Sequence, residues 1–488
     1  MQIVSNTGSQ NKIQEKEVSL FETCKVDFGI GTNKFSQAMK AMDVYFSPID
    51  FHGEAKLKDG QRVTTKHYVV LTIDKLLSEL QKVNGGLASF NGCHYWYNGA
   101  YWNKLSDEEL KDFLGLVANK LGIDEVTSKH FSFKDNLLNQ FRASSHVRFG
   151  PKIGAVLINF GNGTLEIGSD GVPMLREFNS MDYLTYQLPF DYHPEADCPL
   201  FFEFLDYILP NKDDQQIIAE FLGYAFLPNS YLKLEKALLL VGDGQNGKST
   251  LGEIVRKIYG DQNVSSYTLN SLCQENGYYR AMLQNKLLNF ASEISGKMDT
   301  TIAKALISGE NIEVRKPYQE PQIMSDYAKL MFASNSMPQT VEHNKAYYRR
   351  FIFIEFGVTI PKEKINPKLA KQICDIELPG IFNWVMLGLK RILTAQQFTY
   401  SAKSESLLAD FKIQSDEIRL FLDDEKIIPD FNNEIPLKDL YQIYRHYCLA
   451  NGYKFCSNRC FSDRIRKLGF SLFRKNTGYM VNAFQILG

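Results

Sequence analysis

The residues GDGQNGKS at 242–249 have the types and the spacing of a phosphate-binding loop, G-x-x-x-x-G-K-[ST]. Glycine lets backbone N–H groups turn inward around phosphate oxygens, and the start of a helix adds the positive end of its dipole. Lys248 is expected to reach the β- and γ-phosphates, and the Ser249 hydroxyl to bind Mg²⁺. The sequence therefore predicts a site for ATP and Mg²⁺ that is formed by Gly242, Asp243, Gly244, Gln245, Asn246, Gly247, Lys248, Ser249 and Thr250.

A loop of this kind has to lie between a buried strand and a helix. The apolar run ALLLV at 237–241 is typical of a buried strand, and TLGEIVRKIYG at 250–260 continues as a helix that Gly260 ends. From about residue 235 onward the pattern favours an α/β core. The alternative is a chance match in a flexible glycine loop, and the correct flanking elements argue against it.

Three further polar positions stand at the ends of apolar runs that read as strands. Glu293 ends the run within 285–295, where its carboxylate could hold Mg²⁺, orient the attacking water, or be an exposed strand-end group. Asn335 follows AKLMFAS and could reach the γ-phosphate, although Asn is also a common turn residue. Arg349 and Arg350 precede FIFIEF and could enter a neighbouring subunit's phosphate site or form a surface ion pair.

Length and composition limit the classes of protein to which the chain can belong. Its 488 residues predict roughly three domains, and 44% hydrophobic content excludes a largely disordered chain. No run approaches the roughly 18 apolar residues of a membrane span, and the first residues lack the apolar segment of a secretory signal. The eight cysteines never form C-x-x-C, so reduced thiols and a cytoplasmic location are the expectation.

Two hairpins are predicted in the first 197 residues. HYWYNGAYW at 94–102 places Asn98-Gly99 between two aromatic runs, which predicts a type I′ turn, and AVLINFGNGTLEIG at 155–168 predicts a second hairpin. The aromatic side chains of the first hairpin could stack on bases, but packing on the N-terminal core is the interpretation we favour.

Helices are predicted on either side of the second hairpin. The stretch 106–122 has Ser106 as N-cap in a capping box, and 198–228 has helical periodicity.

Charge is divided sharply near the C-terminus. Residues 401–435 hold four Lys or Arg against nine Asp or Glu, and residues 436–488 hold nine against two. The acidic segment is predicted to be a mobile tether, and the basic one a module that binds a polyanion.

The basic segment reads as a winged helix, with helices over 436–452 and 456–470 and a wing over 471–481. The alternative is a solvated basic face on a small helical cap. The candidate DNA-binding residues of this segment are Arg459, Arg464, Arg466, Lys467, Arg474 and Lys475.

The ordered set of motifs resembles one family. GDGQNGKST, SE after an apolar strand, ISGENIEVRKPYQE, KLMFASNSMP, YYRRFIFIEF and ELPGIFNWVMLGLKRIL occur in this order. The set resembles the superfamily III helicases of the phage/plasmid and poxvirus primase–helicase type, which are AAA+ ring ATPases. The resemblance covers about residues 155–395. Within the family, it is greatest to the Rep replication initiators of phage-inducible pathogenicity islands and related cassette helicases.

The resemblance implies a role for each polar position. Lys248 and Ser249 would be the Walker A pair, Glu293 the Walker B acid and Asn335 sensor 1, with Arg349 or Arg350 as the arginine finger acting in trans. The segment 310–322 is similar to the hairpin that holds DNA in the ring channel, with Arg315 and Lys316 as its cations. Many relatives have two adjacent acids where this chain has Ser292-Glu293, so one carboxylate would cover both metal and water.

The predicted organisation is an α/β protein: an α+β collar or docking domain (1–197), an AAA+ P-loop ATPase core (198–398), an acidic linker (399–435) and a winged helix (436–488). The first domain lacks primase motifs, so priming is left to another protein. The expected function is an ATP-dependent DNA helicase and replication initiator of a mobile element. It would form a ring, expected to be a hexamer, with single-stranded DNA in the channel and duplex origin DNA at the C-terminal domain.

Two other functions compete with this one. The first is an ATP-driven DNA-binding switch that remodels DNA without unwinding it. The second is a stand-alone P-loop kinase, which would need neither the paired arginines nor the 310–322 hairpin.

Overall fold

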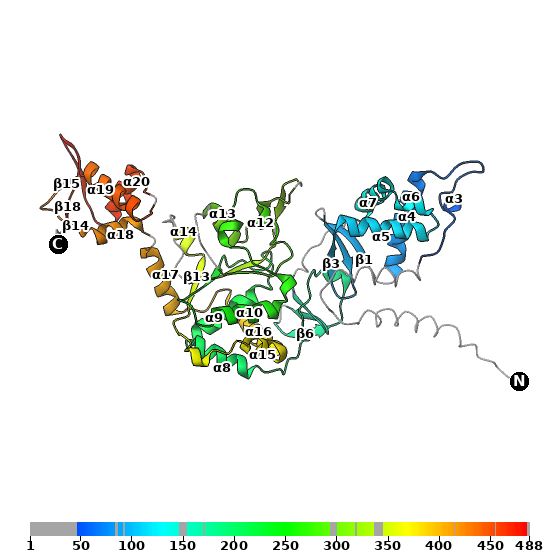
Figure 1. Cartoon of the computed structure of the whole chain (residues 1–488), viewed down its shortest axis with the longest axis horizontal. Coiled ribbons are helices and arrows are strands. Elements are labelled where there is room, and N and C mark those ends of the chain that lie inside the picture. The colour runs from blue at the N-terminus through cyan, green and yellow to red at the C-terminus, as the bar shows by residue number, and fades with distance from the viewer. Residues whose placement is uncertain are drawn as a thin grey trace. The chain divides into compact units, whose positions relative to one another are not determined.

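The computed structural model describes residues 46–82, 86–90, 93–145, 154–168, 171–292, 300–317, 320–335, 345–414, 416–453 and 455–485. The chain divides into two compact units, Met1–Tyr192 and His193–Gly488, so the boundary lies five residues before the predicted one (Figure 1). The protein is a mixed α/β protein whose second unit is built on a parallel sheet.

The first unit combines a helical layer with small antiparallel sheets. Its described helices are α3 (Phe51–Glu54), α4 (Thr65–Lys82), α5 (Asp107–Lys120), α6 (Glu125–Lys129), α7 (Phe131–Ser144) and the 3-10 turn η3 (Ser180–Asp182). Its described strands are β1 (Gly86–Phe90), β2 (Cys93–Tyr97), β3 (Trp102–Leu105), β4 (Val156–Phe160), β5 (Gly163–Ile167) and β6 (Pro173–Arg176). Helices α4, α5 and α7 share one apolar core, in which Leu76, Leu114 and Leu137 are fully buried.

Both predicted hairpins form, but the turn of the first differs from the prediction. In the β2–β3 hairpin Tyr97 pairs with Trp102, so the loop has the four residues 98–101 and is not a two-residue type I′ turn. The Asn98 side chain accepts hydrogen bonds from the backbone N–H groups of Ala100 and Tyr101 at 2.9 and 2.8 Å. Asn98 therefore stabilises a longer turn through its side chain and does not adopt a left-handed backbone. Tyr95 and Trp102 are buried, which agrees with core packing.

The second unit has a five-stranded parallel sheet among its described residues, in the order β13-β7-β12-β9-β8. The strands are β7 (Ala237–Val241), β8 (Val264–Ser265), β9 (Leu288–Ala291), β12 (Lys329–Ser334) and β13 (Phe351–Glu355). β7 precedes the glycine loop and lies between β12 and β13. Residues that follow these three strands therefore meet at one edge of the sheet.

Helices cover both faces of this sheet. Those of the core are α8 (Pro199–Ile208), α9 (Lys212–Tyr224), α10 (Lys248–Tyr259), α11 (Leu269–Leu272), α12 (Tyr278–Ala281), α13 (Thr300–Ile307), α14 (Lys345–Tyr348), α15 (Leu369–Ile376) and α16 (Leu378–Ala395), with the 3-10 turns η4 (Asp261–Asn263) and η5 (Lys362–Lys364). On one face Leu239, Phe332 and Phe353 share a core with α13. Figure 1 shows α9, α10 and α16 on the other face. There α9 and α16 pack closely, because a Cβ on Gly223 would lie 2.6 Å from the backbone of Leu389.

The segment predicted to contain the channel hairpin forms a short antiparallel pair. β10 (Ile312–Val314) pairs with β11 (Gln322–Met324), and Ile312 lies opposite Met324. Arg315 and Lys316 follow β10 directly, and Arg315 is exposed.

The acidic segment 399–435 is largely helical, so the prediction of a mobile linker is wrong. Helix α17 (Ala402–Gln414) packs on β13 and places Leu408 and Phe411 in the core of the sheet. The Phe411 ring centroid lies 5.0 Å from that of Phe353 and 5.2 Å from that of Tyr348. Leu408 and Phe411 lie on one face of a helix because they are three residues apart. The prediction rested on the number of charged residues and took no account of these apolar positions.

The C-terminal part contains the two predicted helices, followed by an antiparallel pair of strands. Its elements are α18 (Glu417–Asp424), β14 (Ile427–Pro429), β15 (Ile435–Pro436), α19 (Leu437–Ala450), α20 (Asn458–Lys467), β16 (Leu472–Lys475), β17 (Gly478–Val481) and β18 (Ala483–Gln485). Ser457 caps α20 as predicted, and its hydroxyl accepts a hydrogen bond from the N–H of Cys460. Helix α18 belongs to this core, where Phe421, Tyr444 and Phe461 pack together.

Candidate nucleotide site

The glycine loop lies between β7 and α10, as the sequence predicts. Gly244 and Gly247 have φ of 99° and 85°, a left-handed conformation that favours glycine. A Cβ on Gly242 would lie 2.4 Å from the side chain of Asn246 and from the carbonyl oxygen of Phe356. The glycines therefore allow a close turn that brings the loop into the first turn of α10, where backbone N–H groups remain available to phosphate.

Lys248 lies at the centre of this loop. It is the first residue of α10 and only 6% exposed, and its ammonium donates hydrogen bonds to the Gly242 carbonyl and to Asn246 Oδ1 at 2.5 and 2.9 Å. Burial lowers the pKa of Lys248 from its ordinary value, and the nearby Asp243 carboxylate opposes this shift. Both hydrogen-bond acceptors are neutral groups of the loop, so phosphate oxygens bound here would add negative charge beside the ammonium.

Ser249 and Thr250 follow in the first turn of α10. The Ser249 side chain is exposed and that of Thr250 is half-buried. If the loop bound phosphate, a serine hydroxyl in this position could serve as an oxygen ligand of Mg²⁺. Among the residues that the structure describes, no group of three or more His, Cys, Asp or Glu side chains could hold a metal ion.

Asn335 is brought beside the loop. Ser334 pairs with Val241 in the β12–β7 register, and the Gly242 N–H donates to the Ser334 carbonyl at 3.2 Å. Asn335, the next residue, is exposed at this edge. Glu293 lies outside the described residues; the strand that precedes it, β9, ends at Ala291.

Arg349 and Arg350 lie at the opposite end of the sheet from the loop. They form the turn before β13, and β13 runs parallel to β7. A five-residue strand spans about 16 Å at roughly 3.3 Å per residue. Neither arginine can therefore meet phosphate bound at its own chain's loop.

The two arginines have different surroundings. Arg350 is 8% exposed and donates to the Ser308 hydroxyl at 2.7 Å and to the Ala346 carbonyl. The Arg349 side chain is 65% exposed, with Glu235 at 3.3 Å. Arg350 is thus a part of the core, while Arg349 projects from the surface.

The groups that hold this turn were missed by sequence reasoning. Glu235 is paired with both arginines, and the Lys236 ammonium donates to the Arg349 carbonyl at 2.5 Å. Burial lowers the pKa of Lys236. More than 100 residues separate these partners, so no local pattern could have indicated the contact.

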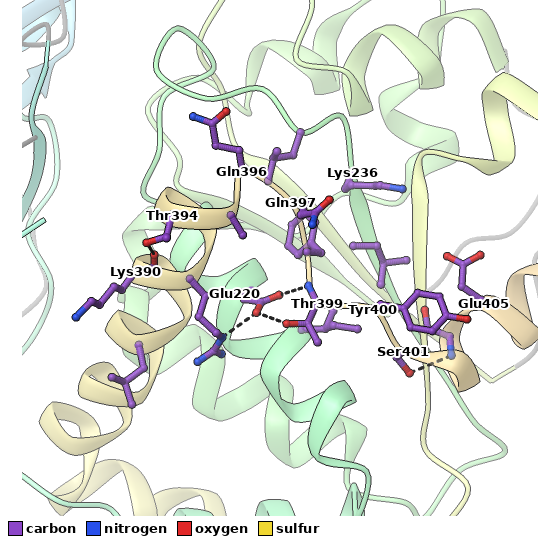
Figure 2. A pocket seen from close by; sticks show the side chains of 18 of the residues that line it. Glu220, Lys236, Lys390, Thr394, Gln396, Gln397, Thr399, Tyr400, Ser401 and Glu405 are labelled. Carbon is purple, nitrogen blue, oxygen red and sulfur yellow. Dashed lines mark hydrogen bonds and ion pairs between the residues drawn. The ribbon is translucent and has the colours of Figure 1, made fainter.

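A cavity of about 880 Å³ adjoins the same turn, at the amino ends of β7 and β13 (Figure 2). Lys236 lines it. At its floor the buried Glu220 carboxylate accepts hydrogen bonds from Arg391 Nε at 2.8 Å and from the Thr399 N–H and hydroxyl at 2.8 and 2.6 Å. These contacts join α9, α16 and the segment before α17, so the cavity has a rigid floor.

The hairpin cations are held close to a buried arginine that the sequence did not single out. The guanidinium of Arg280 is 5% exposed and donates to the carbonyls of Leu272, at 3.0 Å, and of Glu313 in β10, at 3.3 Å. Arg280 therefore fixes the backbone two residues before Arg315. Lys316 is half-buried.

The six basic candidates of the C-terminal part are not equivalent. Arg464 is only 15% exposed and lies 2.6 Å from both Asp416 and Glu417, so it joins α20 to the start of α18. Arg466 has Asp463 at 3.1 Å, and Lys475 is paired with Glu434. The side chains of Arg459, Lys467 and Arg474 are exposed.

Comparison with known proteins gives two matching families and several similar structures. Residues 76–210 match the family described as D5 N terminal like, and residues 240–350 match a family of unknown function, DUF5906. The second match runs from β7, the strand before the glycine loop, to Arg350. Within the described residues, no helix has the length and apolar character needed to cross a membrane.

The similar structures are of the NrS-1 C-terminal region. Its A-form apo structure has a TM-score of 0.46 at 13% identity, covering 85% of this chain and 98% of that chain. An apo structure of the same region has a TM-score of 0.47 at 13% identity, covering 86% and 99%. Likeness at this level does not assign a function. The match over 76–210 is to the N-terminal part of primase–helicase-type proteins, and it is consistent with a phage primase–helicase family.

Proposed function

We propose that this protein is an ATP-dependent DNA helicase and replication initiator of the superfamily III type, with an AAA+ core that works as a ring. One observation carries the proposal. The phosphate loop and the exposed Arg349 lie at opposite ends of one parallel sheet. A site that needs both is completed only by a second subunit, and head-to-tail contacts of that kind close into a ring when the rotation between successive subunits closes.

Nucleic-acid binding is supported by two groups of residues. The cations that follow β10 would contact single-stranded DNA in the ring channel, and the D5 N-terminal-like match is in keeping with a replication protein. In the C-terminal part, α19, α20 and the β16–β17 ribbon follow one another as in a winged helix. Its exposed basic residues Arg459, Lys467 and Arg474 are the proposed contacts to duplex origin DNA.

Strand displacement tests the function directly. The full chain with ATP and Mg²⁺ should separate a forked duplex, and particle images with ATP should show rings. An ATPase that binds the fork without separating it would identify the alternative, a DNA-binding switch. A separate primase remains a proposed partner. If the chain alone makes no primers on a single-stranded template with nucleotides, priming requires such a partner.

Lys316→Ala is expected to uncouple hydrolysis from unwinding. Unwinding should fall about tenfold or more, because one phosphate contact is lost in every subunit of the ring. Basal ATP hydrolysis should stay within about twofold, because Lys316 follows β10 and not the phosphate loop. Rates of both reactions should be measured beside Lys371→Ala, an exposed lysine on α15. Equal loss of both activities would remove the hairpin from the mechanism.

Arg464→Ala should lower the stability of the protein, whereas Arg459→Ala should weaken its binding to DNA. Removing Arg464 takes away the guanidinium that pairs with the buried Glu417 carboxylate, which keeps its hydrogen bond from the Tyr444 hydroxyl, so the C-terminal part should lose about 3 kcal/mol of unfolding free energy. Removing the exposed Arg459 should leave stability unchanged and weaken binding to origin duplex. Denaturant unfolding and duplex binding at fixed salt check this. A stable Arg464→Ala protein with weakened binding would return Arg464 to the DNA-binding set.

A further inference from the structure

Helix α8 packs directly on the phosphate loop. A Cβ on Gly247 would lie 2.7 Å from Cγ2 of Ile208 and 3.3 Å from Cε2 of Phe204. Gly247 is the residue before Lys248, where α10 begins. The last turn of α8 therefore borders the place where phosphates are expected.

The chain that follows β13 borders the same place. The Ile360 N–H donates to the carbonyl of Gln245, inside the loop, at 2.7 Å. The 3-10 turn η5 comes next, and the Lys364 ammonium lies 5.2 Å from the centroid of the Tyr207 ring on α8. One aromatic ring and one cation thus lie together, and each comes from a segment that contacts the loop, although the two segments are about 150 residues apart.

Tyr207 has a surface to offer to a ligand. It is 39% exposed, while Phe204 and Ile208 on the same helix are buried against Gly247. At the start of the loop, Gly242 is enclosed by backbone, because it contacts the carbonyls of Phe356 and Ser334. A nucleotide whose phosphates lie at Lys248 needs a flat apolar surface for its base, and an aromatic side chain supplies one.

We propose that the nucleobase of the bound nucleotide stacks on Tyr207, with Lys364 at the border of this base site. This inference rests on the proposed binding of ATP at the phosphate loop. It assigns the base-binding side of the loop to α8 and η5, and makes Tyr207 a residue that distinguishes a nucleotide from bare phosphate.

The test compares ADP with inorganic pyrophosphate, both with Mg²⁺, by titration calorimetry on the full chain. Tyr207→Ala should weaken ADP binding about tenfold and leave pyrophosphate binding within about twofold, because only ADP carries a base. Tyr207→Phe keeps the ring and should bind ADP like the unchanged protein. Tyr231→Ala is the matched control, because Tyr231 is a tyrosine of similar exposure, 38%. Its N–H donates a hydrogen bond to the Pro228 carbonyl, close to the amino end of β12 and so at the other end of the sheet from the loop.

Two results would overturn the inference. One is unchanged ADP binding in Tyr207→Ala, and the other is equal weakening of ADP and pyrophosphate in a variant that melts normally. Failure of the unchanged protein to bind either ligand would be a different result, since it would overturn the proposed ATP site itself and this inference with it.

Discussion

Lys248→Ala is expected to lose nearly all ATP hydrolysis and to leave the protein folded. The ammonium is the charged group of the loop nearest the expected phosphates, and its hydrogen bonds go to Gly242 and Asn246 of the loop itself. Removing one such preorganised charge costs about a thousandfold in turnover. Steady-state hydrolysis at saturating ATP measures the loss, and thermal unfolding shows whether the fold persists.

A matched variant separates charge at the site from charge on the helix. Lys257 lies on the same helix, α10, but is exposed and pairs with Asp261 four residues on. Lys257→Ala should hydrolyse ATP at the normal rate, because an exposed pair of this kind stabilises by less than about 1 kcal/mol. Near-normal turnover in Lys248→Ala would contradict the assignment of 242–249 as a phosphate loop.

Arg349→Ala should also lose hydrolysis, by about a thousandfold, while its thermal unfolding is unchanged. The side chain is 65% exposed and lies a strand's length from its own loop, so its contribution would be made in a neighbouring subunit. Mixing Arg349→Ala with Lys248→Ala should restore part of the activity, since one protein keeps an intact loop and the other an intact arginine. Hydrolysis across mixing ratios, with mixed rings verified, measures this recovery.

Arg350→Ala is the contrasting variant. Its guanidinium is bound to Ser308 and Ala346 inside the core, so its removal should lower the unfolding temperature. Mixing Arg350→Ala with Lys248→Ala should give no more hydrolysis than the folded fraction of Arg350→Ala gives by itself. The roles of the two arginines would be reversed by the following result. Arg350→Ala would unfold at the normal temperature and restore hydrolysis when mixed with Lys248→Ala, while Arg349→Ala would be destabilised and would restore none.

The sequence by itself determined those features in which a short stretch of chain decides the conformation. The glycines of 242–247 and the apolar run before them specify the succession of strand, loop and helix from neighbouring residues alone, although distant residues also contact the loop. Ser106 with Glu109, and Ser457 at α20, cap their helices because the bonding groups lie three residues apart. Local spacing also gave the hairpin at 155–168.

Only the tertiary structure decided which of several similar side chains face solvent. Arg349 and Arg350 are neighbours in sequence, yet Ser308, 42 residues away, makes one of them internal. Arg464 belongs to a basic helix, but its ion pairs with Asp416 and Glu417 hold its side chain away from solvent. The acidic segment became a helix because Leu408 and Phe411 could be buried against β13. In each case the burial free energy depends on a partner far along the chain, and composition and periodicity carry no information about that partner.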